Sequence, residues 1–140
     1  MSQLLAPGST IYAVDFDASA LEEIPDRHNE VEIRKIVGDL ESQTLRLPTV
    51  DGMLIANTLH FIREQQSLLG RLLTVTDRFL VVEYERSMSN RWGPYPVRFE
   101  KLSQLFSEVG VDRVEKLTTR PSLFGGTMYS ALTQRSKTSS

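Results

Sequence analysis

The stretch Val50–Phe61 constrains the fold of this chain more than any other. Its apolar run Met53–Ala56 shows no alternation, which is typical of a strand covered on both faces in a parallel sheet. Asn57, Thr58 and His60 follow at the carboxyl end of that run. Because ligands of open α/β sheets bind outside the carboxyl ends of the strands, these polar residues form a candidate site. Turn and helix-capping roles explain Asn57 and Thr58 equally well.

The composition predicts a single globular domain. The chain has 140 residues, of which 40% are apolar and 24% are charged, and this is enough for one core. We expect the domain to span residues 1–134 and residues 135–140 to form a flexible tail. No stretch of the sequence approaches a membrane span, and the N-terminal pattern does not fit a secretory signal, so a cytoplasmic location is expected.

Charge and cysteine content argue against several functions. The formal net charge of −2 gives no reason to expect a nucleic acid or an anionic membrane as a partner. The chain has no cysteine, which excludes disulfides, thiolate metal ligands and cysteine nucleophiles. The two histidines, His28 and His60, do not stand in a ligand-spaced motif, so no metal site is predicted.

Strands and helices alternate along most of the chain. Strand-forming runs end in acidic residues at Asp15, Asp39 and Glu83, and several helices with an apolar face lie between the strands. We expect strands at 10–15, 31–37, 53–57, 79–82, 113–119 and 127–133, and helices at 18–24, 61–73 and 99–109. The last two strands should form an antiparallel hairpin at one edge of the sheet, and Gly110 should end the last helix.

Segments spread over nearly the whole chain carry a family resemblance. They are Ile11–Asp15, Val37–Asp39, Asp51–Phe61, Phe79–Glu85, the "VEY" and "W.PYP" patterns of Val82–Tyr84 and Trp92–Pro96, and the terminal hairpin with Pro121–Gly126 and Tyr129–Ala131. In this order they resemble a class I S-adenosylmethionine-dependent methyltransferase of the small bacterial type. The resemblance implies an α/β fold with a Rossmann-like, mostly parallel sheet and an antiparallel C-terminal hairpin. It also implies S-adenosylmethionine as cofactor and a small-molecule acceptor.

The resemblance assigns five residues to cofactor binding. Asp15 corresponds to the acid that holds the ribose hydroxyls, and a carboxylate can accept hydrogen bonds from two neighbouring hydroxyls at once. Phe16 would flank the adenine. Asp39 would receive the adenine amino group, with the main-chain amide of Leu40 beside it, although a solvated loop acid is the alternative for Asp39. Asn57 matches the residue at the strand end that faces the methionine part.

The acceptor side involves a second group of residues. By the same resemblance, His60 and Glu83 are candidate catalytic bases, and Tyr84, Trp92 and Tyr95 would line the substrate. Methyl transfer depends chiefly on aligning the nucleophile, the methyl group and the sulfur, so residues that position the reactants matter most. Trp92 and Tyr95 could equally well fill the core beneath their loop, because each buries a large surface.

One part of the family pattern is missing from these 140 residues. Members of the family begin with a strand, a glycine-rich loop that holds the methionine end of the cofactor, and a helix. The eight glycines of this chain include no G-x-G run. The sequence is therefore expected to represent an N-terminally truncated domain that lacks the first strand and helix and has no autonomous activity.

The absent strand would leave the strands at 10–15 and 53–57 facing a gap. Each buried backbone group without a partner costs on the order of 1 to 3 kcal/mol, so an open gap would be costly. Direct pairing of the two strands, a homodimer, or a partner chain that supplies the missing strand could close it. The alternative function is a dimeric or interaction module that derives from a methyltransferase and is not an enzyme.

Overall fold

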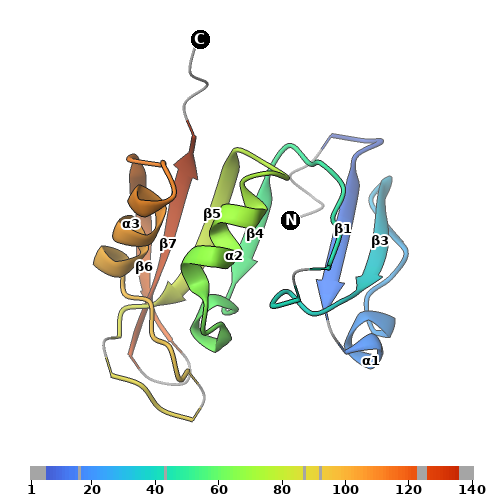
Figure 1. Cartoon of the computed structure of the whole chain (residues 1–140). Helices are drawn as coiled ribbons and strands as arrows, with labels where there is room; N and C mark the ends of the chain where they lie inside the picture. The colour runs from blue at the N-terminus through green and yellow to red at the C-terminus, as the bar shows by residue number, and fades with distance from the viewer. Residues whose placement is uncertain are drawn as a thin grey trace, which may run out of the picture. The chain divides into compact units, whose positions relative to one another are not determined.

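The computed structural model describes residues 6–15, 17–42, 44–86, 88–91, 93–122 and 126–135 (Figure 1). The chain divides into two compact units, and the boundary lies between Arg46 and Leu47. No helix among the described residues is long and apolar enough to cross a membrane.

The first unit is a small sheet with one short helix. Its elements are β1 (Thr10–Asp15), α1 (Ala18–Glu22), β2 (Arg27–His28) and β3 (Val31–Val37), and the strand order is β1-β3-β2. β1 and β3 run parallel, as the family resemblance implies, whereas β2 pairs antiparallel with β3. The two-residue strand β2 was not predicted, because its residues are polar and carry no strand signal.

The helix of the first unit is shorter than its apolar pattern suggests. The side chain of Asp17 accepts a hydrogen bond from the amide of Ser19 and so caps the first turn. The helix ends at Glu22, before Ile24, which the sequence placed in its last turn. Among the described residues of this unit, Leu21 and Val31 are the buried apolar ones. The core of the first unit is therefore small.

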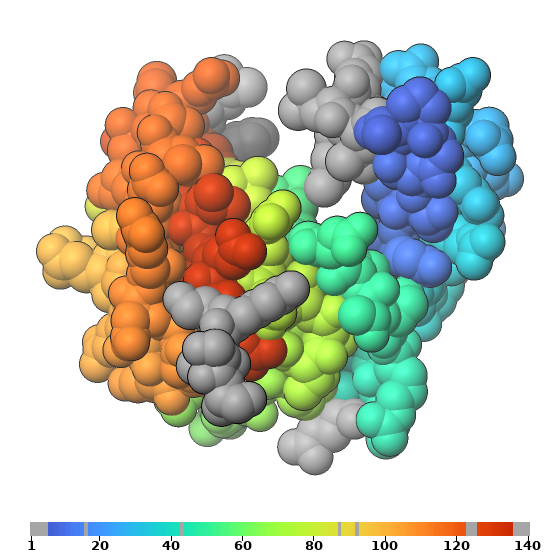
Figure 2. Space-filling model, turned by 90° about the horizontal axis from the view of Figure 1, so that it is seen from above, coloured from blue at the N-terminus to red at the C-terminus, as the bar shows by residue number. Residues whose placement is uncertain are grey.

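The second unit holds a four-stranded sheet and the longer helices. Its elements are β4 (Met53–Ala56), the 3-10 helix η2 (Leu59–Phe61), α2 (Gln65–Leu72), β5 (Arg78–Tyr84), α3 (Phe99–Glu108), β6 (Val114–Pro121) and β7 (Thr127–Gln134). The strand order is β4-β5-β7-β6, with β4 and β5 parallel and the other pairs antiparallel. In Figure 2 the red atoms of β7 lie between the orange and the yellow-green parts of this unit. The C-terminal hairpin is confirmed.

Both longer helices cover the same face of this sheet (Figure 1). The side chains of β5 that point to the helices, Phe79, Val81 and Glu83, are buried, and the residues between them are half-buried. The rings of Phe79 and Phe106 lie 5.6 Å apart and join β5 to α3. Gly110 follows α3 with a φ of 93°, the left-handed conformation predicted for it.

The helix predicted over 61–73 is interrupted. Ile62 has an extended backbone, with φ −95° and ψ 123°, and it separates η2 from α2. The side-chain amide of Gln65 donates to the main-chain oxygens of Leu59 and Tyr95, at 2.8 and 2.9 Å. The oxygen of Leu59 also accepts the amide of Ile62 at 2.9 Å, so Gln65 adds a second donor to this carbonyl at the break.

Within its own sheet, each of β1 and β4 is an edge strand. The expectation that the run Met53–Ala56 is buried on both faces was wrong. Ile55 is buried against the helices, but Leu54, which points to the other face, is 40% exposed because α2 and α3 cover only one face.

Arg135, which the sequence assigned to a flexible tail, contacts residues of the second unit. Its amide donates to the main-chain oxygen of Asp77 at 2.8 Å, and its guanidinium pairs with the carboxylate of Asp77. One guanidinium nitrogen also donates to the main-chain oxygen of Leu73 at 3.0 Å. Residues 136–140 lie outside the described residues.

Candidate functional site

A buried carboxylate lies at the centre of the candidate site in the second unit. Glu83 is 1% exposed and lies within β5, opposite Tyr129 of β7, rather than beyond the end of its strand. It accepts hydrogen bonds from the Nδ1 of His60 at 2.8 Å, the amide of His60 at 3.2 Å and the amide of Tyr84 at 3.3 Å. These donors offset the cost of burying the charge.

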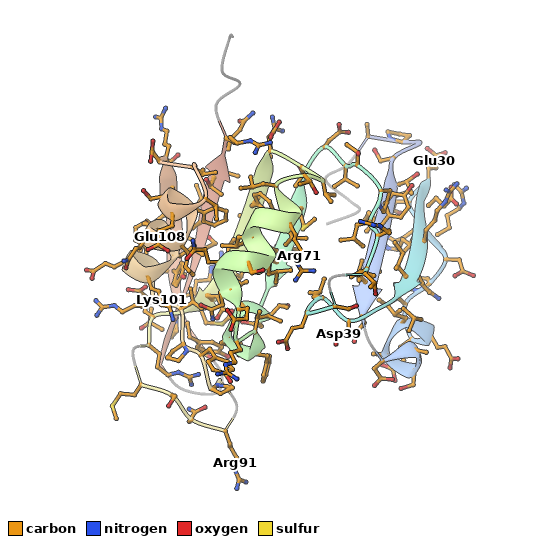
Figure 3. All side chains as sticks on the ribbon, viewed as in Figure 1. Glu30, Asp39, Arg71, Arg91, Lys101 and Glu108 are labelled. Carbon is orange, nitrogen blue, oxygen red and sulfur yellow. The ribbon has the colours of Figure 1, made fainter. Side chains whose placement is uncertain are left out.

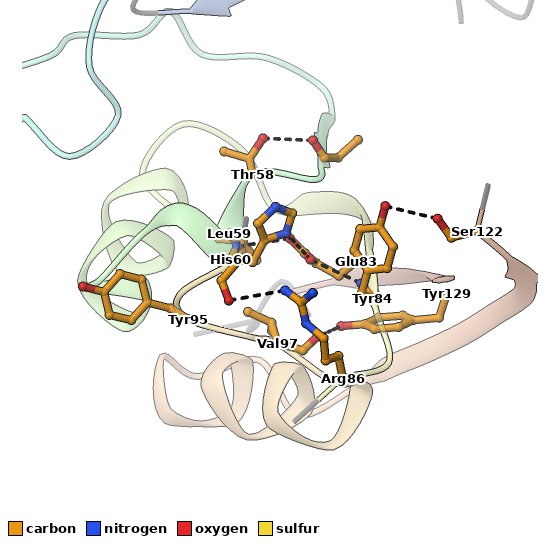
Figure 4. A network of polar contacts seen from close by, with 12 residues as sticks. Thr58, Leu59, His60, Glu83, Tyr84, Arg86, Tyr95, Val97, Ser122 and Tyr129 are labelled. Carbon is orange, nitrogen blue, oxygen red and sulfur yellow. Dashed lines mark hydrogen bonds and ion pairs between the residues drawn. The ribbon is translucent and has the colours of Figure 1, made fainter. Parts of the chain in front are cut away.

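The ring of His60 is held by this carboxylate. His60 belongs to η2, is 4% exposed, and its main-chain oxygen accepts the amide of Tyr95 at 2.9 Å. Because the carboxylate of Glu83 accepts from Nδ1, that nitrogen carries the proton in the neutral ring, and Nε2 keeps its lone pair. Nε2 points away from Glu83 (Figure 4) and makes no hydrogen bond to any residue that the structure describes.

Two aromatic rings flank His60. The ring of Phe61 lies 4.3 Å from it, centroid to centroid, and Phe61 is 51% exposed. The ring of Tyr84 lies 6.0 Å away in an edge-on arrangement. The hydroxyl of Tyr84 accepts a hydrogen bond from the hydroxyl of Ser122 at 3.3 Å. The polar side chain of His60 thus lies between two aromatic rings, and the ring of Phe61 is exposed.

The loop after β5 packs closely over this pair. A guanidinium nitrogen of Arg86 donates to the main-chain oxygen of Gly93 at 3.3 Å, and Asn90 and Gly93 form an isolated β-bridge. A Cβ atom at Gly93 would lie 3.4 Å from the Cδ2 of His60 and 1.9 Å from the Nη2 of Arg86. Gly93 therefore allows the loop to approach both side chains.

The first unit contributes two acids at one end of its parallel strands. Asp15 ends β1, its register partner Val37 ends β3, and Asp39 follows two residues later. Figure 3 shows Glu30 at the start of β3 and Asp39 beyond its other end. One oxygen of Asp15 accepts the amide of Asp17 at 3.0 Å, and one oxygen of Asp39 accepts the amide of Glu41 at 2.9 Å.

Asn57 marks the end of β4. Its amide donates to the main-chain oxygen of Val82 at 2.9 Å, and its φ of 54° is left-handed. Asparagine adopts this conformation more readily than most residues, and such backbone conformations often accompany binding sites. The hydroxyl of Thr58 donates to the main-chain oxygen of Ala56 at 2.9 Å, a turn contact that accords with the structural role considered for Thr58.

The predicted site residues fall into several groups in the structure. His60, Glu83 and Tyr84 are brought together within the second unit, and Tyr95 joins them through its main-chain amide. Asp15 and Asp39 lie at the same end of the sheet in the first unit, with Leu40 directly after Asp39, and Asn57 follows β4. Phe16 and Trp92 lie outside the described residues.

Sequence reasoning missed three participants. Phe61 was assigned to the apolar face of a helix, Gln65 to the polar face of the same helix, and Arg86 to an ordered loop. Gln65 could have been identified only if the break between η2 and α2 had been predicted, and nothing in the sequence marks that break. No group of three or more potential metal-ligating side chains occurs among the described residues.

No protein-family profile matches this sequence, and no curated protein is significantly similar to it. Solved structures do match its fold. EvdMO1 matches with 21% identity and a TM-score of 0.58 over 93% of this chain and 32% of EvdMO1. The YcgJ protein of Bacillus subtilis matches with 10% identity and a TM-score of 0.66, over 91% of this chain and 82% of YcgJ. The plantazolicin methyltransferase BpumL, solved with S-adenosylhomocysteine, matches with 14% identity and a TM-score of 0.65, over 96% of this chain and 69% of BpumL.

A SAM-dependent methyltransferase from Aquifex aeolicus also matches, with 15% identity and a TM-score of 0.56, over 91% of this chain and 84% of that protein. The similarity to BpumL and to this protein shows that the chain has an α/β fold that S-adenosylmethionine-dependent methyltransferases share. The chain spans about a third of the length of EvdMO1, and 75% of the N-terminal domain of EvdMO1, which was solved with S-adenosylhomocysteine bound. The predicted α/β fold class is confirmed at this level.

Proposed function

We propose that this chain is an S-adenosylmethionine-dependent methyltransferase-like domain that acts on a small molecule. The observation that carries the proposal is the placement of Asp15 and Asp39 at the same end of two neighbouring parallel strands. Ligands of open α/β sheets bind at this end of the strands. The fold that the chain shares with known methyltransferases supports the same interpretation.

The two acids suit the adenosine part of the cofactor. In each carboxylate a main-chain amide holds one oxygen, and the second oxygen makes no hydrogen bond to any described residue. The second oxygen of Asp15 can accept from the ribose hydroxyls, and that of Asp39 from the adenine amino group, with Phe16 and Leu40 beside the base. When bound, the cofactor supplies an electrophilic methyl group.

By the family resemblance, we assign further residues to the methionine part of the cofactor and to the acceptor. Asn57 at the end of β4 would face the methionine part, and Tyr84, Trp92 and Tyr95 would contact the acceptor. His60 and Glu83 are the residues that we assign to proton handling. The hydrogen bond between them, 2.8 Å long, supports this assignment because it fixes one imidazole tautomer.

We further propose that these 140 residues alone transfer methyl groups slowly or not at all. A glycine-rich loop and the following helix N-terminus would supply main-chain donors and a favourable dipole for the carboxylate of the cofactor. The sequence contains no G-x-G run that could play this part. A loop supplied by another segment or chain should therefore raise the affinity for S-adenosylhomocysteine.

Titration with S-adenosylhomocysteine, followed in 1H–15N spectra, tests the cofactor assignment even when binding is weak. The amides of residues 15–17 and 39–41 should shift with increasing ligand. Asp15→Asn should weaken binding roughly tenfold or more, because hydrogen bonds to a charged group contribute about 1.5 to 3 kcal/mol. Asp17→Asn is the matched control, since it changes an exposed acid two residues away and keeps a good capping residue. Unshifted amides at both acids in the folded protein would refute the assignment.

A dimeric or interaction module is the second candidate function. The observation in its favour is that β1 and β4 are both edge strands, and that Leu54 of β4 is 40% exposed. Edge strands of this kind are surfaces on which another chain can add a strand. Sedimentation of the wild type and of Leu54→Lys tests this function. A dimer that the substitution dissociates supports it, and a wild-type monomer at all concentrations contradicts the homodimer.

A further inference from the structure

The arrangement around His60 limits what kind of acceptor the second unit can serve. Both oxygens of Glu83 accept hydrogen bonds, Oε2 from Nδ1 of His60 and Oε1 from the amide of His60. A carboxylate engaged in this way is poorly placed to take a proton from a ligand. Nε2 of His60 carries a lone pair and has no partner among the described residues, so it is the better proton acceptor.

We propose that the acceptor is an aromatic alcohol, that Nε2 of His60 takes its hydroxyl proton, and that Glu83 positions the ring of His60. This inference rests on the proposed methyltransferase function and names the substrate class for it. His60 is then the catalytic base. Glu83 acts through His60 and is a positioning residue.

The proton step balances within the acceptor and His60. The O–H bond of the acceptor breaks, its electron pair stays on oxygen, and a new N–H bond forms at Nε2. The resulting imidazolium carries its charge next to the carboxylate of Glu83, 2.8 Å from Nδ1. When bound, the cofactor would supply the methyl group: its methyl–sulfur bond would break with the electron pair left on sulfur, and the acceptor oxygen would use its own electron pair to bond the methyl carbon. An acceptor without a transferable proton would not use His60 as a base.

Phe61 is the reason for choosing an aromatic alcohol. Its ring lies 4.3 Å from that of His60, centroid to centroid, and is 51% exposed, so it offers an apolar surface directly beside a buried polar group. An aromatic ring packed on Phe61 would gain about 0.5 to 1.5 kcal/mol beyond its burial. The same placement could bring a ring hydroxyl toward Nε2, because Phe61 and His60 are adjacent in η2.

The tautomer of His60 can be measured without any ligand. Long-range 1H–15N spectra of the wild type should show His60 as a single Nδ1–H tautomer, with His28 as the internal reference histidine. Glu83→Gln should lose this preference, because an amide can either donate or accept, and Glu83→Asp should restore it in part. A wild-type Nε2–H tautomer overturns the proposal, whether or not the variants fold.

Three small molecules test the role of His60 and the role of Phe61 separately. Phenol should shift the Nε2 resonance of His60 and bind roughly 2- to 10-fold more tightly than anisole, which has no hydroxyl proton. Cyclohexanol keeps the hydroxyl but lacks the ring, and it should also bind less tightly than phenol. Equal binding of phenol and anisole overturns the role of His60, and equal binding of phenol and cyclohexanol overturns the role of Phe61.

Variants of the aromatic surface complete the test. Phe61→Leu should weaken phenol binding roughly 2- to 10-fold and leave cyclohexanol binding nearly unchanged. Leu117→Ala, at an exposed position on β6, is the control and should change neither. Unchanged phenol affinity in Phe61→Leu contradicts the proposal.

The outcome is independent of cofactor binding. If S-adenosylhomocysteine shifts the amides at Asp15 and Asp39 but phenol does not reach Nε2, the acceptor inference fails and the proposed function stands. If phenol behaves as expected but S-adenosylhomocysteine shifts neither set of amides, the assignment of Asp15 and Asp39 to cofactor binding fails instead.

Discussion

The hydroxyl group of Tyr129 donates a hydrogen bond to the main-chain oxygen of Val97, with 2.6 Å between the two oxygens. Both residues are almost fully buried. The bond fixes the end of the loop after β5 to the centre of the sheet, just before α3 begins. The hydrogen bond between Tyr129 and Val97 thereby holds the loop that packs on His60, although neither residue is His60 or its direct partner.

Tyr129→Phe should destabilise the second unit by about 1 to 3 kcal/mol. The substitution keeps the ring but leaves the oxygen of Val97 buried without its donor, which accounts for the loss. Urea unfolding followed by circular dichroism measures it. Tyr84→Phe is the control, because its hydroxyl only accepts a 3.3 Å bond from Ser122 in a half-buried place, and it should cost less. A smaller effect of Tyr129→Phe than of Tyr84→Phe would contradict this account.

Stability should also depend on Tyr129 at alkaline pH. Burial, and next the charges of Glu83 and Glu85, raise the pKa of Tyr129 well above its ordinary value. The folded state thus keeps the phenol proton after the unfolded state has lost it near pH 10. The stabilisation is present below about pH 10 and is lost as the pH rises above it, at about 1.4 kcal/mol per pH unit. In pH-dependent unfolding, the difference in stability between wild type and Tyr129→Phe should be constant below about pH 10 and should shrink above it. Parallel curves would refute the role of Tyr129.

Gly93→Ala should disturb the loop over His60. The new Cβ would lie 1.9 Å from the Nη2 of Arg86, so the guanidinium must move and give up its bond to the oxygen of Gly93. Because Nη2 is the far end of a flexible side chain, the main loss is that one hydrogen bond, and we expect about 0.5 to 1.5 kcal/mol in thermal or urea unfolding. Gly52→Ala is the matched control, because its Cβ would find only ordinary contacts at 3.8 and 3.9 Å.

The double variant Gly93→Ala with Arg86→Ala tests the cause. If the collision with Arg86 explains the loss, Gly93→Ala should cost less in the Arg86→Ala background than in the wild type. An unchanged cost would place the strain elsewhere.

The contacts of Arg135 predict a sharp boundary for truncation at the C-terminus. A chain that ends after Arg135 should keep wild-type stability if residues 136–140 contribute nothing to the fold. A chain that ends after Gln134 loses the pair with Asp77 and the bond to Leu73, for a cost of about 1 kcal/mol. Part of that cost should disappear in high salt, because the pair is partly exposed. Equal stability of the two truncated chains would contradict this.

Local signals predicted most of the secondary structure. Apolar runs located β4 and β5, Gly110 marked the end of α3, and the hairpin of β6 and β7 followed from its strand pattern. The interruption between η2 and α2 was not predictable, because it depends on Gln65 reaching the main-chain oxygen of Tyr95, thirty residues along the chain. The apolar spacing is the same for a broken and a continuous helix.

The candidate site was predictable as a set of residues but not as an arrangement. His60 and Glu83 were both named as bases, and their separation of 23 residues gave no indication that one would hold the other. The strand order and register bring them together, and these depend on how the sheet assembles. The burial of Glu83 was not predictable either. An acidic residue after an apolar run usually indicates the end of a strand, whereas Glu83 continues the strand and points inward.

Because β4 is hydrogen-bonded to a neighbouring strand on one side only, the exchange rates of its amides can report whether a strand binds on the other side. In β4, amides that point toward β5 alternate with amides that point away, so hydrogen–deuterium exchange along Met53–Ala56 should alternate between slow and fast. Any chain or segment that adds a strand there would slow the fast set and leave the slow set unchanged. Four consecutive amides could therefore report the docking of a neighbour whose identity is unknown.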